Sequence, residues 1–302
     1  MRVAVVIPTK NEEGSIASVI CSVREVLTSV GHETIIYITD DSHDKTRKVA
    51  KDLGAVVIRG GGDGLGTAML RGLKAALATN PDVIMSVDAD GQVDIASELL
   101  NFLSLIQEGV CDLVIGSRFK ADGLIHYQYR KINRLGTRTL VGILRRQTGL
   151  SLTDSHGGIR AMIPAVVEEL EMIGSHTYVQ ETIIDAHEKG FRILEIPSKW
   201  LPRRYGNSKV VKSIPRYVMY TLPVLFLRSG KHVRWLNSLG LLSFFGGILF
   251  FVVILIQEGF SYSLADRLPG LTLVALLITT GLQLFFFGLV LQFLKQIKKQ
   301  SS

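Results

Sequence analysis

Hydrophobic positions in the first 120 residues follow two spacings. Short apolar runs bounded by polar residues or glycine predict buried strands, and apolar residues at every third or fourth position predict helices. The strand-like runs are RVAVVIP, ETIIYITD, AVVIRG, DVIMSVDAD and CDLVIGSR, with helical patterns between them. This alternation predicts an α/β domain in which a mostly parallel sheet is flanked by helices on both faces. Ligands of such sheets bind beyond the carboxyl ends of the strands.

The pattern becomes looser after residue 120. A basic helical run, YRKINRLGTRTLVGILRR, is followed by TDSHGGIRAM, which predicts a turn that leads into the start of a strand or helix. The run TYVQETIIDAHEKG then predicts a helix, and FRILEIPSKWLPRR predicts a strand that ends near its two prolines. We therefore expect the α/β domain to extend to about residue 210.

Two long uncharged apolar runs, 236–257 and 270–293, follow this domain. A helix needs ~20 apolar residues to cross a bilayer, so both predict transmembrane helices rather than buried core helices. Basic residues flank the pair on both outer sides, which places both flanks in the cytoplasm. The preceding segment, 211–234, mixes basic, aromatic and apolar residues, which fits either a helix on the membrane surface or a peripheral core helix.

The expected organisation therefore has four parts. They are a cytoplasmic α/β domain (1–210), an amphipathic membrane-surface segment (211–234), a transmembrane hairpin (235–294) and a basic cytoplasmic tail (295–302).

Composition adds a basic net charge of +7 and a mean hydropathy of +0.30. The charge suits anionic lipid and phosphate ligands, and no nucleic-acid-binding signature accompanies it. The two cysteines lie far apart and suggest neither a metal site nor a disulfide framework. The first residues, MRVAVVIP, predict a strand rather than a signal peptide.

The stretch SVDADGQVD places Asp88 and Asp90 directly after a buried strand. Two carboxylates at this spacing can share Mg²⁺ or Mn²⁺, with Gln92 as a further oxygen ligand and substrate phosphates completing the coordination. A solvated acidic turn is the alternative for so short a motif. The metal hypothesis therefore needs support from other parts of the chain.

Polar, glycine and basic residues near other strand ends provide that support. Asp40 and Asp41 could accept hydrogen bonds from a nucleoside, or could cap the next helix. The glycines of GGGDGLGTA, including Gly66, permit close backbone approach to a ligand or form a tight turn. The cations suited to phosphate are Arg118, Arg130, Arg134, Arg203 and Lys209.

Seven motifs in this order resemble family 2 glycosyltransferases of the GT-A fold. They are VVIPTKNEEGSI, ITDDSHDKT, GLGTAMLRGL, SVDADGQVD, VIGSRF, TDSHGGIRAM and PRRYGNSK. Within this family, the chain is similar to the dolichyl-phosphate mannose synthases and related polyprenyl-phosphate glycosyltransferases. The resemblance covers residues 1 to about 210.

This resemblance implies a role for each matching position. The nucleotide-sugar site would comprise Pro8, Glu12, Asp40, Asp41, Gly66, Asp88, Arg203, Ser208 and Lys209. Asp88, Asp90 and Gln92 would hold the metal. The acceptor site would comprise Arg118, Arg130, Arg134, Asp154 and Glu181, with Asp90, Arg118 and Arg130 as the catalytic residues.

Three positions depart from the family pattern. Lys10 stands where an uncharged residue is common, which weakens the expectation of a base-stacking contact there. Gly157 and Ile159 stand where serine and an aromatic residue are usual, in a region that often contacts the acceptor in this family.

The expected reaction is an inverting transfer of one hexose to dolichyl or another polyprenyl phosphate. A lipid phosphate is already anionic and needs no general base, whereas a hydroxyl acceptor would need one, with Glu181 or Asp154 as candidates. GDP-mannose is the leading donor, with UDP-glucose and UDP-N-acetylglucosamine as alternatives. No Q-x-x-R-W motif of processive synthases is present. A non-catalytic membrane protein that binds nucleotide sugar is the alternative from another class, and the small residues of FFGGILFF could support a homo-oligomer.

Overall fold

The structure is a computed structural model that describes residues 1–176, 178–205, 214–258 and 268–301. It contains two compact units, Met1–Leu225 and Phe226–Ser302, each with its own packing. The residues around the expected boundary at 210 lie outside the described ranges, so the proposed division into functional domains stays a prediction.

The first unit is built on a seven-stranded sheet with the strand order β3-β2-β1-β4-β6-β5-β7. The strands are β1 (Arg2–Thr9), β2 (Glu33–Asp40), β3 (Val56–Arg59), β4 (Val83–Val87), β5 (Leu113–Ser117), β6 (Ile159–Met162) and β7 (Ile193–Pro197). Every pairing is parallel except those of β6, which runs antiparallel to both β4 and β5. The sheet is therefore mixed but mostly parallel, as the alternating pattern predicted.

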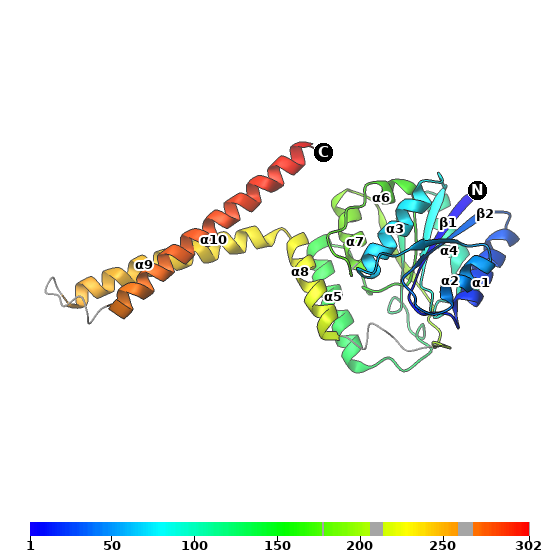
Figure 1. Ribbon diagram of the computed structural model, residues 1–302, viewed down its shortest axis with the longest axis horizontal. Coiled ribbons are helices and arrows are strands. Elements are labelled where there is room, and N and C mark those ends of the chain that lie inside the picture. Colours follow the sequence, from blue (N-terminus) through cyan, green and yellow to red (C-terminus); the bar gives the residue numbers. More distant parts are fainter. Residues whose placement is uncertain (177, 206–213, 259–267, 302) are drawn as a thin grey trace. The chain divides into compact units, whose positions relative to one another are not determined.

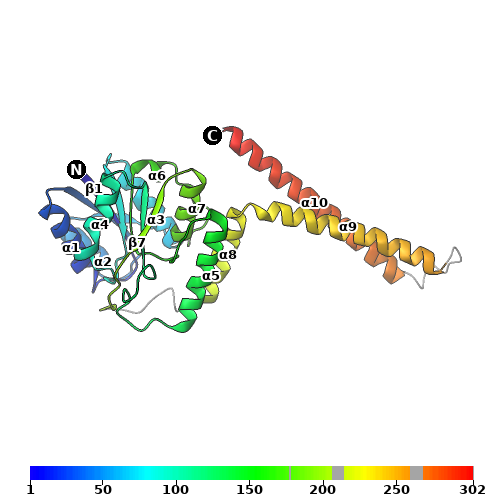
Figure 2. The same cartoon turned by 180° about the vertical axis from the view of Figure 1, so that it is seen from behind.

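Helices cover both faces of this sheet, as both views show (Figures 1 and 2). Alternate residues of β1 supply the two cores: Val3 and Val5 pack in one, and Ala4 and Val6 pack in the other. The first core is closed by α1 (Ile16–Ser29), α2 (Thr46–Asp52) and α4 (Ile95–Gln107). The second is closed by α3 (Leu65–Leu77), α5 (Lys131–Thr148), α6 (Pro164–Glu168) and α7 (Tyr178–Glu188).

Strand order brings the ends of β1 and β4 together. These two strands pair directly although two strands and three helices separate them in sequence. The chain leaves β1 toward β2 on one side and leaves β4 toward the other half of the sheet, so the order reverses between them. A ligand site is expected at such a reversal.

The helix α8 (Ile214–Arg228) ends the first unit and extends three residues past it. Leu225 is buried in the second core, and the carbonyl of Leu225 accepts a 2.8 Å hydrogen bond from the Gln147 side chain on α5. Met219, by contrast, is 73% exposed, and Leu222 is exposed as well. One side of the helix is thus anchored in the first unit and the other is apolar and open, so the membrane-surface segment stays a prediction beside the peripheral core helix.

The second unit is a pair of long helices, α9 (Lys231–Glu258) and α10 (Leu268–Ser301). The segments His232–Ile256 and Leu268–Leu294 are long and apolar enough to cross a membrane, and few of their residues are buried within the protein. Both helices are longer than the expected spans, because α9 begins before residue 236 and α10 continues through the basic tail.

Glycines spaced seven residues apart form the seam between α9 and α10. Gly240 and Gly247 lie on α9, and Gly281 and Gly288 lie on α10. A Cβ atom at Gly240 would lie 2.7 Å from the Gly281 carbonyl oxygen, so the two backbones are in near contact. Small residues allow this close approach in a lipid environment, where van der Waals packing replaces the hydrophobic effect. Ser243 adds a 2.8 Å hydrogen bond to the Leu277 carbonyl.

We expect Gly281→Leu to disrupt the seam, because its side chain would meet the backbone of Phe244. Overpacking of this kind costs about 1–3 kcal/mol. Thermal unfolding of the detergent-solubilised protein should therefore begin at a lower temperature. The matched control is Gly246→Leu, since nothing lies within 4 Å of a Cβ atom at Gly246. Equal stability of the two variants would contradict the glycine seam.

Candidate active site

Two carboxylates lie at the carboxyl end of β4, where the sequence predicted a metal site. The amide of Asp88 donates to the Gly158 carbonyl at 3.0 Å. Within the described ranges no hydrogen bond reaches the Asp88 carboxylate. Asp90 accepts a 3.1 Å hydrogen bond from the Gln92 amide through one oxygen, and its other oxygen lies 2.6 Å from an Nη atom of Arg203. The loop therefore presents one carboxylate paired with arginine and one without a hydrogen bond.

Arg203 joins the carboxylate loop to the region after β1. Its other Nη atom lies 3.8 Å from a carboxylate oxygen of Glu12. All three side chains in this cluster, Arg203, Asp90 and Glu12, are largely buried. Three residues that the resemblance assigned to the donor site from distant parts of the chain are thus brought together.

Burial and the neighbouring charge of Asp90 raise the pKa of Asp88 to about 7. Arg160, Arg118 and Arg203 oppose this rise, because a nearby cation favours the ionised carboxylate. Burial and Asp90 outweigh the three arginines in their effect on this pKa. Arg118 and Arg203 are already paired with carboxylates.

The segment before Arg203 holds the Gln92 loop in place through backbone pairing. Leu201 donates to the Gln92 carbonyl at 2.7 Å, and the Gln92 side-chain amide donates back to the Leu201 carbonyl at 3.2 Å. Trp200 forms isolated bridges with Val93 and Ile125, so it links this loop to residues 124–126. The position of Gln92 is consequently fixed on both sides.

The two aspartates at the end of β2 have different surroundings. Asp40 is fully enclosed and accepts hydrogen bonds from the Thr9 hydroxyl, the Ser42 amide and Arg47. Asp41 is partly exposed and accepts a 3.0 Å hydrogen bond from the amide of Gly62 in the glycine-rich loop. A nucleoside could thus reach Asp41 more readily than Asp40. Pro8 lies within β1, next to Thr9.

Gly66 lies at the start of α3 and packs against another loop of the protein. Its amide donates to the Ser175 carbonyl at 2.6 Å, and a Cβ atom there would lie 2.8 Å from the same oxygen. That loop is held in turn by Glu181, whose two carboxylate oxygens accept from the amides of Ile173 and Gly174 at 2.7 and 2.9 Å. Glu181 is fully buried. Gly66 and Glu181 are therefore part of one packing arrangement, and their ligand contacts remain predictions.

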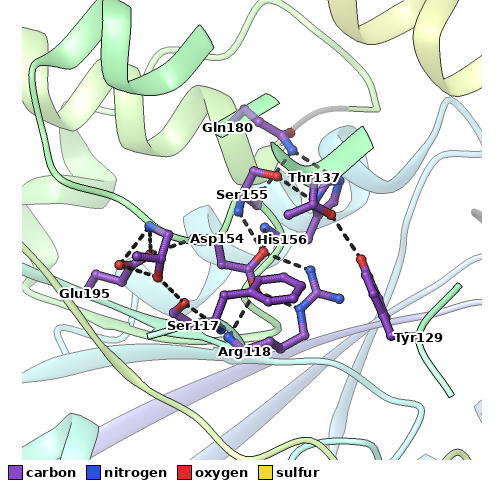
Figure 3. A network of polar contacts seen from close by, with 11 residues as sticks. Ser117, Arg118, Tyr129, Thr137, Asp154, Ser155, His156, Gln180 and Glu195 are labelled. Carbon is purple, nitrogen blue, oxygen red and sulfur yellow. Dashed lines mark hydrogen bonds and ion pairs between the residues drawn. The ribbon is translucent and has the colours of Figure 1, made fainter. Parts of the chain in front are cut away.

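Arg118 and Asp154 form a buried, two-pronged ion pair at the end of β5 (Figure 3). The Nε and one Nη atom of Arg118 donate to the two carboxylate oxygens at 2.7 and 2.8 Å, and the Arg118 amide donates at 3.1 Å. The guanidinium also lies over the rings of Tyr129 and Trp200. Burial raises the pKa of Asp154, but Arg118 outweighs this effect and lowers the pKa to about 2.

A second carboxylate, Glu195 on β7, holds the segment that carries Asp154 (Figure 3). It accepts hydrogen bonds from the amides of Thr153 and Asp154 and from the Thr153 hydroxyl at 2.8–2.9 Å. The ion pair with Arg118 therefore ties this segment to β5, and Glu195 ties it to β7.

The other two arginines assigned to the acceptor lie at the surface. Arg130 is the N-cap residue of α5, and Arg134 lies one turn into this helix; both are exposed. The guanidinium of Arg134 lies 5.9 Å from the Phe119 ring centre. An incoming anion could reach these two side chains without breaking an ion pair. The remaining two predicted residues, Ser208 and Lys209, lie outside the described ranges.

Sequence reasoning missed Arg160, which is 1% exposed on β6. Within the described ranges its three guanidinium nitrogens have no hydrogen-bond partner, although the Tyr178 ring lies 5.4 Å away. The sequence did offer a signal for Arg160: it lies in the HGGIR stretch, directly after Ile159, one of the positions that depart from the family pattern. The two glycines of this stretch allow close packing, because a Cβ atom at Gly157 would meet the Gly116 carbonyl and one at Gly158 would meet Asp88.

His156 was also missed, and it lies in the network of Figure 3. Its Nδ1 atom is 2.7 Å from the Ser155 hydroxyl. Burial, together with the charge of Arg118, lowers the pKa of His156 to about 4, so its ring is neutral near pH 7. Its role here is to fill and connect the network rather than to add charge.

The oxygen donors at the carboxylate loop fit a divalent cation that is completed by substrate. Among the described residues no cluster of three or more His, Cys, Asp or Glu side chains could hold a metal. Asp88, Asp90 and Gln92 instead offer two carboxylates and one amide, a set that Mg²⁺ or Mn²⁺ accepts when phosphate and water supply the other ligands. The Asp88 carboxylate, free of hydrogen bonds, is the observation that supports this fit.

The family profile described as glycosyl transferase family 2 matches residues 4–171. The chain belongs to glycosyltransferase family 2. The match spans more than half of the chain and includes β1, the carboxylate loop and the Arg118–Asp154 pair. The expected resemblance to this family is confirmed, and the protein is a glycosyltransferase rather than a non-catalytic binding protein.

The chain is similar to several named hexosyl- and mannosyltransferases, and the names of two of them include a polyprenol or dolichol. It is 27% identical over 94% of its length to the low-salt glycan biosynthesis hexosyltransferase Agl6 of Haloferax volcanii, of which it covers 67%. It is 28% identical over 72% of its length to the polyprenol monophosphomannose synthase of Mycolicibacterium smegmatis, of which it covers 84%. A dolichol-phosphate mannosyltransferase of Pyrococcus furiosus is 30% identical over 73% of this chain and 62% of its own.

Solved structures agree on the fold. Glucosyl-3-phosphoglycerate synthase of Mycobacterium tuberculosis, crystallised with Mn²⁺, UDP-glucose and phosphoglyceric acid, has a TM-score of 0.58 at 22% identity, with 76% of this chain and 79% of that chain covered. Mannosyl-3-phosphoglycerate synthase of Rubrobacter xylanophilus has a TM-score of 0.59 at 17% identity, with 74% and 73% covered. These likenesses confirm the expected GT-A-type α/β fold.

We expect Asp154→Asn to destabilise the catalytic unit by about 3–5 kcal/mol, because it leaves the buried Arg118 charge uncompensated. The matched control is Asp112→Asn, since Asp112 makes the same two-pronged contact with Arg192 but at the surface. That loss should be much smaller. Denaturant unfolding of both variants measures the difference, and equal losses would contradict the importance of burial.

The same pair predicts a pH dependence. The folded-state pKa of Asp154, about 2, lies below its ordinary 3.8. Its contribution, about 2 kcal/mol, is therefore fully present above pH ~4 and is lost as pH falls through 2. Asp154→Asn should flatten this part of the stability profile.

Proposed function

We propose that the protein transfers one hexose from a nucleotide sugar to a polyprenyl phosphate, with inversion and with a divalent cation at the leaving diphosphate. Its family membership, the names of its relatives and its two long apolar helices support this proposal. The product would be a β-linked sugar phosphate of the lipid when the donor is α-linked.

The choice of a phosphate acceptor rests on the contacts that the two candidate general bases, Glu181 and Asp154, already make. Glu181 accepts backbone hydrogen bonds through both oxygens. Asp154 is held by Arg118, and at a pKa of about 2 it is a poor proton acceptor. A hydroxyl acceptor would need a general base, and the carboxylates of both these candidates are already engaged. A phosphate acceptor arrives as an anion and needs none, so this arrangement favours phosphate.

Cations then have to keep two anionic substrates from repelling each other. We propose that Arg130 and Arg134, which are exposed on the first turns of α5, meet the acceptor phosphate. Arg118 already uses its Nε and one Nη atom on Asp154, so it would add at most its other Nη atom while fixing the acceptor side of the site. Holding the phosphate oxygen in line with the breaking bond is the main catalytic task of these residues.

The donor would lie over the ends of β1 and β4. We propose that Asp88, Asp90 and Gln92 hold Mg²⁺ or Mn²⁺, which would neutralise charge on the diphosphate as it leaves. Arg203 would exchange its contact with Asp90 for the donor phosphates, and Asp41 would contact the nucleoside. GDP-mannose remains the lead donor because of the mannose transferases among the relatives, and UDP-sugars remain alternatives.

We further propose that α9 and α10 cross the membrane with both flanks in the cytoplasm. The connection between them is short and the outer flanks are rich in Lys and Arg. The open apolar side of α8 would then rest on the same membrane surface, where the phosphate of a polyprenyl lipid is found.

Asp90→Ala should lower the transfer rate by about a hundredfold or more, because the variant loses a metal ligand and the anchor of Arg203. The matched control is Asp94→Ala in the same loop, since Asp94 pairs with Lys199 at 3.2 Å and has no proposed part in the reaction. Transfer of labelled sugar into the organic phase measures both. Near-normal activity of Asp90→Ala would refute the metal assignment.

A donor screen tests the whole proposal. Membranes that contain the protein would receive dolichyl phosphate, Mg²⁺ or Mn²⁺, and labelled GDP-mannose, UDP-glucose or UDP-N-acetylglucosamine in turn. Lipid-soluble label from one donor would establish the reaction and identify the sugar. Label that appears only when a hydroxyl acceptor replaces dolichyl phosphate would overturn the proposed acceptor.

A further inference from the structure

The helix α10 carries a second regular stripe on the side opposite its seam with α9. The seam positions Val274, Gly281 and Gly288 recur every seven residues and are buried. The opposite positions follow the alternating spacing of four and three residues that characterises helix–helix packing, and all are exposed. This outer stripe consists of Thr272, Leu276, Thr279, Gln283, Phe286 and Val290.

Polar side chains gather on the outer stripe, and one of them is unsatisfied. Thr272 and Thr279 donate to the carbonyls four residues earlier, at 2.6 and 2.7 Å, so their hydroxyls are satisfied within the helix. Gln283 lies near the middle of the candidate span Leu268–Leu294 and is exposed. Among the described residues no hydrogen bond reaches its amide.

The outer face of α9 has a different character. From Leu241 to Ile256 its exposed positions are apolar or glycine, among them Leu242 at 72%, Leu249 at 65% and Ile256 at 76%. Such a face is fully compatible with lipid. The two helices of the hairpin therefore differ: the outer face of α10 carries an amide, and the outer face of α9 does not.

An amide exposed to hydrocarbon is costly, and interhelical hydrogen bonds between such side chains are a known force for association. We propose that the outer stripe of α10 is a self-association surface, in which Gln283 of one protomer hydrogen-bonds Gln283 of a second copy. This rests on the membrane-spanning part of the proposed function.

Membrane insertion itself favours a second copy as the partner. All copies of an inserted chain share one topology, so their α10 helices run parallel and place Gln283 at the same depth. A twofold axis along the membrane normal then brings identical stripes together. Each amide has both a donor and an acceptor, so two of them can satisfy one another.

Cysteine cross-linking of the full chain in membranes tests the surface. In a Cys21→Ser, Cys111→Ala background, Leu276→Cys or Phe286→Cys on the outer stripe should form disulfide-linked dimers on mild oxidation. Leu242→Cys and Leu249→Cys on α9 are comparably exposed controls and should not. Equal cross-linking from both faces, or cross-linking to a different protein, would overturn the proposal.

Removal of the Gln283 amide tests whether this group drives the self-association. Gln283→Leu should weaken cross-linking through Leu276→Cys roughly tenfold, as expected for the loss of interhelical hydrogen bonds. Gln292→Leu removes another exposed amide from α10, off the stripe, and should have little effect. Gln283→Asn should restore part of the association. An unchanged dimer yield in Gln283→Leu would refute the role of the amide.

Two further measurements separate this inference from the proposed function. Resistance of the protein to alkaline extraction reports whether the hairpin is inserted, and sugar transfer to lipid reports whether the catalytic unit works. An inserted, active protein that shows one photobleaching step per particle would refute self-association alone. A protein that is extracted by alkali would refute the membrane proposal on which the inference rests.

Discussion

Opposite charges taken out of water hold a structure together only when each is fully matched, and Arg118 and Asp154 meet this condition. Their ion pair lies where β5 ends. The Arg118 guanidinium donates hydrogen bonds to both oxygens of the Asp154 carboxylate and lies over the rings of Tyr129 and Trp200. Glu195 fixes the same segment to β7. This segment continues through Gly157 and Gly158 into the antiparallel strand β6, which carries Arg160. The position of Arg160 near Asp88 therefore depends on the Arg118–Asp154 ion pair.

The sequence predicted the parallel core well because each strand is short, apolar and followed by a regular helix. It left β6 open between a strand and the start of a helix, since IRAM is only four residues long and its antiparallel pairing depends on partners about 45 to 80 residues away. The carboxylate loop could be located because Asp88 and Asp90 follow a buried run. Its contact with Arg203 could not, because that contact depends on backbone pairing between Leu201 and Gln92.

Residue type alone also could not distinguish carboxylates that hold the fold together from carboxylates that can bind a ligand. Asp40 and Asp41 are adjacent and identical, yet Asp40 is enclosed by hydrogen bonds and Asp41 is open. Glu181 suggested a ligand contact, but its carboxylate holds a backbone turn. The number of hydrogen bonds that a carboxylate already accepts decides what it can still do, and that number is a property of the fold rather than of the sequence.

The second unit also shows how far the sequence alone could predict the structure. Length and hydropathy identified two candidate spans, because crossing a bilayer sets a minimum apolar length. They said nothing about which face of each helix meets the other, since Leu, Phe and Val occur all round both helices. The seven-residue recurrence of glycine marks the inner seam, where backbones can touch only without side chains. Once that seam is known, helix geometry identifies the opposite face of α10. Gln283 lies on that face, where its amide is directed away from α9.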